Sequence, residues 1–468
     1  MNDSKTCSRV STLFTRRDVL QTTGCGFGWL AFSALAGTQA SLDAQTADNG
    51  SPLAPKKTPL KPRAKRVIFL CMSGAPSHVD LLDYKPQLNR DSGKPGPRPG
   101  SKWLGSKWKF SQHGQSGLWM SELLPQLAKH ADRMCVVSSM QTDQPAHPQA
   151  FIKLHTGTAQ FVRPSLGAWT LYGLGTENQN LPGFVSLTPP SGFGGATNYG
   201  SSFLPAVYQG TRVGQSDRPI RYASVPNLTA KRTDVDQRKE LDFIQSLNRE
   251  KLNRDSFNPA VDGVIQSYEL AFRMQREMPE VLNLSRETEA TQQAYGIGSE
   301  QCDDMGRKCL LARRMVEAGV RFVEITHGNW DHHFNLNAKL KQSCDEVDQP
   351  IAALLADLAQ RDLLRDTLVV WTGEFGRTPY AEGQEGRDHN TKAFSMWMAG
   401  GGVKPGIAYG RSDDYGYEAV ENPVQIADLH ATMLAILGLD HKSLTHRHAG
   451  RDFRLTDVKG NVISDIMA

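Results

Sequence analysis

The fold is decided by RVIFLCM at residues 66–72 and by TLVVWT at residues 367–372. Both stretches are continuous apolar runs, which is typical of strands buried on both faces of a parallel sheet. The first run ends at Ser73-Gly74 and the second at Gly373, so each leads into a loop with polar residues. We therefore expect both segments to be interior parallel strands.

Strand patterns alternate with helical patterns along the rest of the chain. Shorter apolar runs predict further strands at 133–137, 320–325 and 394–399. The alternation favours a three-layer α/β/α sandwich around a mainly parallel central sheet. Periodic apolar residues predict helices at 121–130, 147–155, 301–318, 349–361 and 424–437.

Residues 1–44 are typical of a twin-arginine signal peptide. Arg16-Arg17 precede an apolar stretch at 19–36, and small residues offer cleavage after Ala40 or Ala44. Such a leader predicts a periplasmic or otherwise exported protein that uses the Tat export machinery. The apolar stretch is interrupted by threonines and glycines, which is weak for a membrane span, although a retained anchor is the alternative. We expect no stable transmembrane segment in the mature chain.

The mature chain is expected to begin with a flexible linker at 45–65, because that segment is rich in proline, lysine and alanine. Residues 66–468 then form the folded part. Within it, 175–300 is predicted to be a loop-rich and helical insert. Its Gly/Pro/Ser-rich part at 175–232 has the length of a lid or binding loop, and 234–286 is helical and highly charged.

Composition excludes two classes of protein. The net charge is +4, partly carried by the leader and linker, and no basic stripe remains for nucleic acid. Five cysteines follow the leader, which is too few for a disulfide scaffold, although one disulfide is possible. They are Cys71, Cys135, Cys302, Cys309 and Cys344.

Histidines and carboxylates gather after the predicted strands. THGNWDHHFN at 326–335 follows one strand and supplies Asp331 and His333. Glu374 follows the strand at 367–372, and His389 lies further on in GRDHN. Side chains at the carboxyl ends of parallel strands converge on one crevice, so these four residues predict a divalent-metal site. The alternative is that they are ordinary surface or core residues.

Several motifs resemble one family across nearly the whole mature chain. These are RVIFLCMSGAPSHVDLLDYKP, GNWDHH, VVWTGEFGRTP, GRDHN, MAGGGVKPG and HRHAGRDFRLTD, in that order. They are similar to the DUF1501 proteins, which are usually exported. The resemblance implies an alkaline-phosphatase-like fold in the alkaline phosphatase and sulfatase superfamily.

The superfamily pattern is matched only in part. Spacing from Thr156-Gly157 places His147 where relatives have a serine, threonine or modified cysteine nucleophile. Ser73-Gly74 stands where relatives have a metal-binding aspartate, and His78 and Asp80, just beyond, could complete a second metal site. Phe375 stands where a histidine is usual. If His147 is not at this position, the nucleophile would first be sought at Ser138, Ser139 and Thr142.

Three roles are open for the nucleophile and for His147. Water activated by one or two metal ions could attack an ester, His147 could itself attack, or His147 could be a ligand or an acid. Arg377 and Arg387 could grip a phosphate or sulfate oxygen pair, or form ordinary salt bridges. Oxygen-rich ligand sets would favour Ca²⁺ or Mg²⁺, and several histidines would favour Zn²⁺ or Mn²⁺.

From these motifs we expect an exported, metal-dependent hydrolase of sulfate or phosphate esters, including esters on glycans. The alternative is a catalytically degenerate metal-binding protein that binds or helps to process acidic polysaccharide at the cell envelope. The missing hydroxyl or thiol nucleophile keeps this alternative open.

Overall fold

A nine-stranded sheet runs through the centre of the molecule in the computed structural model, which describes residues 51–223, 225, 228, 233–254 and 259–468. Every pairing in this sheet is parallel except those of β11, which runs antiparallel to both of its neighbours. In spatial order the strands are β12 (Ile407–Tyr409), β4 (Met134–Gln141), β11 (Phe394–Gly400), β8 (Thr367–Thr372), β1 (Arg66–Met72), β7 (Phe322–His327), β5 (Phe184–Leu187) and β6 (Thr211–Val213), with β15 (Val424–Gln425) also paired to β4.

The two apolar runs are neighbours in the interior of this sheet. β1 pairs with β8 on one side and with β7 on the other, and β8 is flanked by β1 and β11. Successive residues of β1 point to opposite faces, so Leu70 and Phe69 enter two different hydrophobic clusters. Each side chain is at most 2% exposed, and burying one of this size stabilises the fold by about 1.5–3 kcal/mol.

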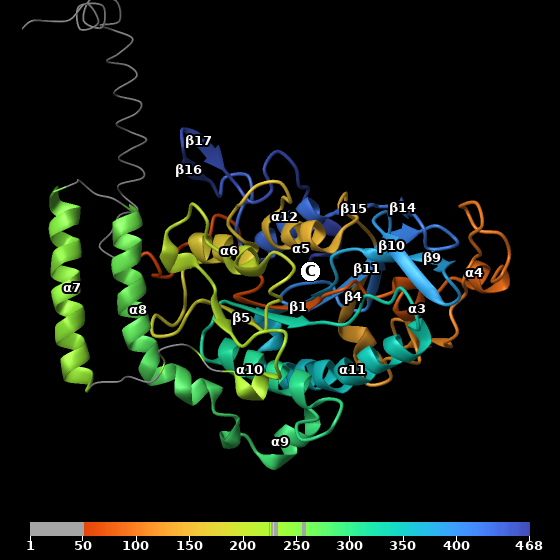
Figure 1. The fold of residues 1–468 in the computed structure, drawn as a ribbon, viewed down its shortest axis with the longest axis horizontal. Helices are drawn as coiled ribbons and strands as arrows, with labels where there is room; N and C mark the ends of the chain where they lie inside the picture. The colour runs from red at the N-terminus through yellow and green to blue at the C-terminus, as the bar shows by residue number, and fades with distance from the viewer. Residues whose placement is uncertain (1–50, 224, 226–227, 229–232, 255–258) are drawn as a thin grey trace, which may run out of the picture. The chain divides into compact units, whose positions relative to one another are not determined.

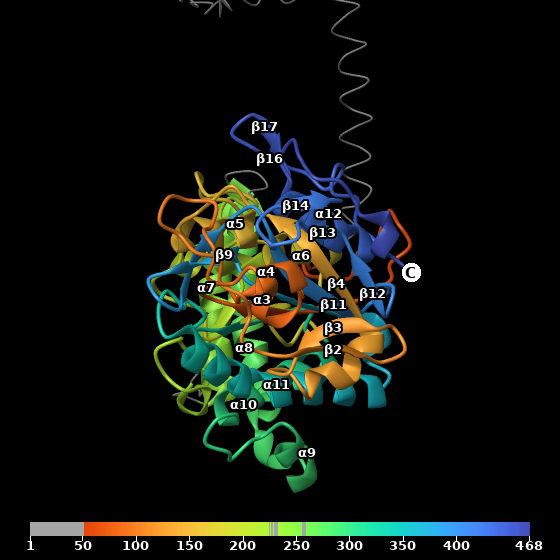
Figure 2. The same ribbon diagram turned by 90° about the vertical axis from the view of Figure 1, so that its right-hand side faces the viewer.

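Helices cover both faces of the sheet, which gives the expected three layers (Figures 1 and 2). One layer holds α5 (His147–Thr156), α6 (Leu166–Leu174) and α12 (Ile426–Ile436), whose large buried apolar side chains belong to one hydrophobic cluster. The other holds α10 (Asp303–Glu317) and α11 (Leu336–Gln360), which bury their apolar faces in the second cluster. The three-layer α/β/α prediction is confirmed.

Some element boundaries differ from the sequence prediction. The helix expected at 121–130 is instead strand β3 (Leu118–Ser121), paired with β2 (Phe110–His113), followed by a 3-10 helix at Leu127–Arg133. Pro125 lies between the two, where it cannot donate the backbone hydrogen bond that a continuous helix requires. Helix α11 begins well before residue 349 and carries Pro350 inside it.

The insert at 175–300 contains more regular structure than its composition indicates. Strands β5 and β6 lie within the segment expected to be loop, and they extend the parallel sheet at one edge. Beyond them come α7 (Asp234–Arg254), α8 (Pro259–Leu282) and α9 (Glu289–Ala294), in the region expected to be helical.

The predicted leader, residues 1–44, lies outside the described residues, and so does the first part of the predicted linker. Residues 51–65, by contrast, pack against the domain rather than form a flexible linker. Leu53 is 1% exposed, and backbone hydrogen bonds tie Lys56 to Leu174 and Ala64 to Ile436. The packed chain therefore begins before residue 66, and residues 52–468 form one compact unit.

The five cysteines that follow the leader are all buried free thiols, so the possible disulfide is absent from the part of the chain that the structure describes. Burial raises the pKa of Cys71, which lies in β1, well above its usual value. None of the helices among the described residues has the length and apolar character needed to cross a membrane.

Candidate metal centre

The candidate residues reach the sheet edge from several elements. Asp331 and His333 lie in the loop after β7, and Glu374 lies just beyond the end of β8. His147 is the first residue of α5, which follows β4. His389 comes from β10 (Gly386–Asn390), which pairs antiparallel with β9 (Gly376–Glu382). The loops after strands of one parallel sheet meet at the same edge, which explains this convergence.

One carboxylate oxygen lies at the centre of the cluster. Asp331 Oδ1 is 2.9 Å from His333 Nε2, 3.1 Å from His147 Nε2 and 3.5 Å from His389 Nε2. The Nε2 atoms of His333 and His389 are 3.0 Å apart. The four ligand atoms all lie within 4.8 Å of one another. Asp331 has a 42% exposed side chain, so the cluster is open to solvent on its side.

Each histidine of the cluster is held through its other ring nitrogen. His147 Nδ1 is 2.6 Å from Glu374 Oε1, and His389 Nδ1 is 2.6 Å from the carbonyl oxygen of Pro145. His333 Nδ1 hydrogen-bonds to the Glu382 carboxylate. An acceptor at Nδ1 fixes the proton on that atom and leaves the Nε2 lone pair available, which is how metal-binding histidines are usually oriented.

Electrostatics within the cluster favour opposite charges on His147 and Asp331. Burial lowers the pKa of His147, but contacts with Asp331 and Glu374 outweigh it and raise that pKa to about 9. Burial alone would raise the pKa of Asp331, yet hydrogen bonds from His147 and His389 and the charge of Arg377 hold it far below its usual range. Without an ion, the cluster therefore holds a proton on His147.

The donor set fits a divalent ion. Two nitrogens bound to one tetrahedral ion at about 2.0–2.1 Å would lie roughly 3.3 Å apart, close to the observed His333–His389 separation. His147 Nε2 is buried and faces the Asp331 carboxylate at 3.1 Å, so a cation bound there would replace the proton that His147 holds in the metal-free cluster. Imidazole nitrogens and one carboxylate suit Zn²⁺ or Mn²⁺.

Glu374 does not contribute an atom to this group of four. Its carboxylate is fully buried, accepts the Gly74 N–H at 2.9 Å and holds His147. Gly74 has φ +107°, and a Cβ there would lie 2.6 Å from the Asp331 backbone nitrogen. A glycine is therefore required where the β1 loop passes between Glu374 and Asp331.

The structure does not bring His78, Asp80 or Arg387 into the cluster. His78 Nε2 lies 2.8 Å from the carbonyl oxygen of Gly416. Arg387 is fully buried and donates to both oxygens of Asp80, at 2.7 and 3.1 Å. This bidentate pair joins the β10 hairpin to the helix after β1, and it occupies the groups that were expected to bind a second metal and an ester oxygen.

Arg377 contacts the cluster through the Asp331 carboxylate. It is 1% exposed, and its guanidinium donates to Asp331 and to the carbonyl oxygens of Gly74, Ala75 and Arg387. Because these acceptors lie inside the chain, the structure places Arg377 as a support for Asp331.

The alternative hydroxyl positions lie at the end of β4 and just beyond it. Ser139 donates its hydroxyl proton to the Asn422 carbonyl oxygen at 2.6 Å, and the Thr142 hydroxyl is buried without a hydrogen bond. The cluster itself, among the described residues, consists of histidines and one aspartate.

Two aromatic rings enclose His147, and the sequence analysis did not assign them to the site. Phe193 stacks on the imidazole with a centroid distance of 5.3 Å, and the Phe375 ring lies 4.7 Å away. Phe193 belongs to the Gly-rich loop that was predicted to be a lid or binding loop. Glu382 and Pro145 were also missed, because no local pattern reveals the acceptor of a distant imidazole proton.

Comparisons with solved structures give low similarity. A sulfatase, PsFucS1, from Pseudoalteromonas sp. matches at 15% identity and a TM-score of 0.38, covering 81% of this chain and 68% of that one. The lipoteichoic acid synthase LtaP from Listeria monocytogenes matches at 8% identity and 0.36, covering 86% and 78%. Alkaline phosphatase from the Antarctic bacterium TAB5 matches at 12% identity and 0.30, covering 77% and 97%.

No curated protein matches the chain significantly. A family model does, over residues 64–467, and its description is "Protein of unknown function (DUF1501)". This match spans the whole sheet and all four cluster residues, as the sequence motifs indicated. The chain therefore belongs to the DUF1501 family.

Proposed function

We propose that this protein is a metal-dependent hydrolase of sulfate or phosphate esters. The observation that carries the proposal is the arrangement of His147, His333 and His389, whose Nε2 atoms face Asp331 while each Nδ1 is held by an acceptor. A divalent ion held by these four residues would neutralise ester oxygens and lower the pKa of water, so that hydroxide would be available near neutral pH.

The chain's own residues prepare this site in defined ways. Glu374 holds the Nδ1 proton of His147, which directs the Nε2 lone pair toward Asp331. Arg377 fixes the Asp331 carboxylate. Phe193 and Phe375 exclude water from the two sides of the imidazole, whereas Asp331 stays accessible to a substrate. In this proposal His147 is a metal ligand rather than the nucleophile.

One observation favours the second candidate, a metal-binding protein without turnover that binds acidic polysaccharide. The position where relatives have a serine, threonine or modified cysteine nucleophile holds His147 in this chain, and its Nε2 faces Asp331. A hydrolase built this way depends on water as the attacking group, whereas a binding protein needs no attacking group.

We also propose that the protein is exported through the twin-arginine route, on the strength of Arg16-Arg17 and the apolar stretch that follows. Metal would then be loaded before export. Cell fractionation of the Arg16→Lys/Arg17→Lys variant tests this, with retention in the cytoplasm as the expected result. Equal export of variant and native chain would contradict it.

The function is tested by metal analysis and turnover on the same preparation. We expect about one equivalent of Zn²⁺ or Mn²⁺ per chain, and metal-dependent release of the aryl alcohol from an aryl sulfate or an aryl phosphate. Esters on glycans are then tested in the same way. Bound metal without turnover of any ester would favour the binding protein. Protein that holds no metal would overturn both candidates.

A further inference from the structure

Helices α7 and α8 pack against each other in an antiparallel pair. Asp234 at the start of α7 pairs with Arg276 near the end of α8 at 3.2 Å, and Gln245 donates to the Ile265 carbonyl oxygen at 2.8 Å. Among the described elements, α8 is the one that α7 contacts extensively, whereas α8 also contacts α10. Helix α7 is therefore the outer member of the pair (Figure 1).

The outer helix leaves most of its described apolar side chains exposed. Among its described side chains, Leu241 is buried against α8, whereas Phe243 is 65% exposed, Val235 63% and Leu247 51%. Phe243 and Leu247 are four residues apart, so they lie on one face of the helix. Exposed apolar side chains that share a face on an otherwise polar helix mark a contact surface.

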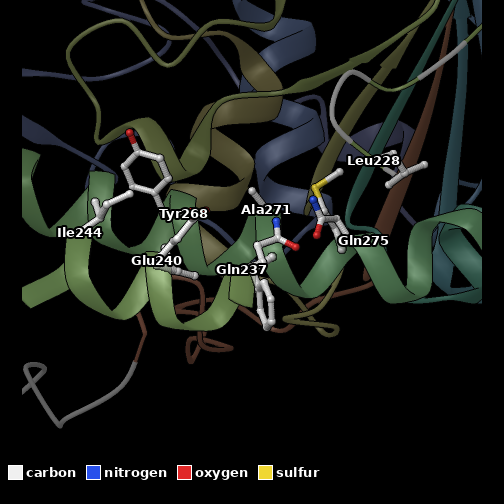
Figure 3. A pocket seen from close by; sticks show the side chains of 10 residues that line it. Leu228, Gln237, Glu240, Ile244, Tyr268, Ala271 and Gln275 are labelled. Carbon is white, nitrogen blue, oxygen red and sulfur yellow. The ribbon is translucent and has the colours of Figure 1, made fainter. Parts of the chain in front are cut away.

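A groove between the two helices continues this surface (Figure 3). It has a volume of about 340 Å³ and is lined from α7 by Ile244 and from α8 by Tyr268, which are 39% and 47% exposed. In Figure 3 these two side chains lie at one end of the groove and Leu228 lies at the other. The apolar surface is thus shared by both helices.

Acidic residues outnumber basic ones in the first half of α7, and basic residues outnumber acidic ones in the second half. Its first half has four acidic and two basic residues, and its second half, from residue 248 to 254, has three basic and one acidic. A second copy of the same helix, running antiparallel, would place each acidic half against a basic half.

We propose that the protein forms a symmetric dimer in which the α7–α8 pairs of two copies pack antiparallel through Phe243 and Leu247. A twofold axis near residue 245 sets Phe243 of one copy against Leu247 of the other. It also sets Asp236 against Arg254. The four helices would then enclose the apolar face, as in a four-helix bundle, and such a contact is closed and self-complementary.

Sedimentation equilibrium or light scattering of the full chain tests this. We expect twice the mass of one chain at micromolar concentration, and we expect Phe243→Lys to weaken the dimer at least about 100-fold. The matched control is Val458→Lys, because Val458 is 80% exposed and lies outside the helix pair. Its dimer should match the native one. Far-UV circular dichroism shows whether each variant is folded.

A charge exchange separates the twofold contact from any other association. Asp236→Lys or Arg254→Glu alone should weaken the dimer on the order of 10-fold, and the double variant should recover most of that loss. These two residues are separated by roughly 27 Å along the helix, so they cannot pair within one chain. Recovery therefore reports a contact between copies.

Two results would overturn the proposal. One is a native chain with the mass of a single copy up to about 100 μM, well above the Kd of specific interfaces. The other is a dimer that keeps its stability in Phe243→Lys and in both single charge variants. In the first case, protein that pellets with anionic lipid vesicles would assign the apolar face to a membrane surface instead.

Discussion

His147 Nδ1 lies 2.6 Å from Glu374 Oε1, across 227 residues of sequence. Glu374 is fully buried, so this hydrogen bond forms in a region of low dielectric where it orients the ring strongly. The opposite nitrogen of the same ring faces Asp331 at 3.1 Å. The role of Glu374 in orienting His147 can therefore be tested separately from the role of His147 in binding a metal ion.

Glu374→Gln should weaken metal binding by about 10–100-fold, because the amide no longer holds the His147 ring as a charged acceptor. The measurement is competition with a chromophoric chelator at constant pH. The control is Glu421→Gln, since Glu421 has a 58% exposed side chain and lies outside the cluster. Equal affinities for Glu374→Gln and the native protein would remove the supporting role of Glu374.

Metal affinity should rise with pH up to about pH 9. The pKa of His147 is raised to about 9 in the metal-free protein, so an ion must displace a proton at lower pH. Below that value we expect affinity to increase about tenfold per pH unit, and to level off above it. Glu374→Gln removes one of the contacts that raise this pKa, so its curve should level off at lower pH. A pH-independent affinity would show that His147 is not a ligand.

The sheet could be predicted from the sequence because consecutive apolar residues at 66–72 and 367–372 leave few alternatives to a buried strand. The proximity of Asp331, His333 and His389 could be predicted because these residues follow predicted strands, whose carboxyl ends meet at one edge of the sheet. Whether Glu374 binds an ion or a histidine could not be predicted, because that choice depends on side-chain packing after folding. For the same reason Arg387 and Asp80, 307 residues apart, gave no sign that they pair.

Arg387→Met should destabilise the fold, because Arg387 pairs with Asp80 rather than with an ester oxygen. Arg387 and Asp80 form a bidentate pair with side-chain exposures of 0% and 1%, and removing one partner leaves a buried charge. We expect the free energy of unfolding in urea to fall by about 3–5 kcal/mol. Arg365→Met is the control, since its pair with Asp362 is exposed and should contribute less than about 1 kcal/mol.

A stable Arg387→Met variant that loses turnover would assign Arg387 to the site after all. Arg387→Lys adds a second readout, because an ammonium group cannot replace the two-pronged contact with Asp80. Its unfolding free energy should also fall.

His147→Ala should abolish metal-dependent turnover of an aryl sulfate or aryl phosphate while the fold survives. The residue begins α5 and lies at the edge of the sheet, so truncation removes a ligand without emptying the core between the sheet and its helices. The structure predicts more than a loss of activity. If His147 is a ligand, its removal should also lower the affinity for the metal ion. If His147 were a nucleophile that does not contact the ion, its removal would leave that affinity unchanged. We therefore expect the alanine variant to bind the ion at least about 100-fold more weakly.

His130→Ala is the matched control, because His130 is another histidine, located on the 3-10 helix at Leu127–Arg133, outside the cluster. A His147→Ala protein with native metal affinity and no turnover would instead make His147 the attacking group, and full activity in that variant would place the reacting atoms elsewhere.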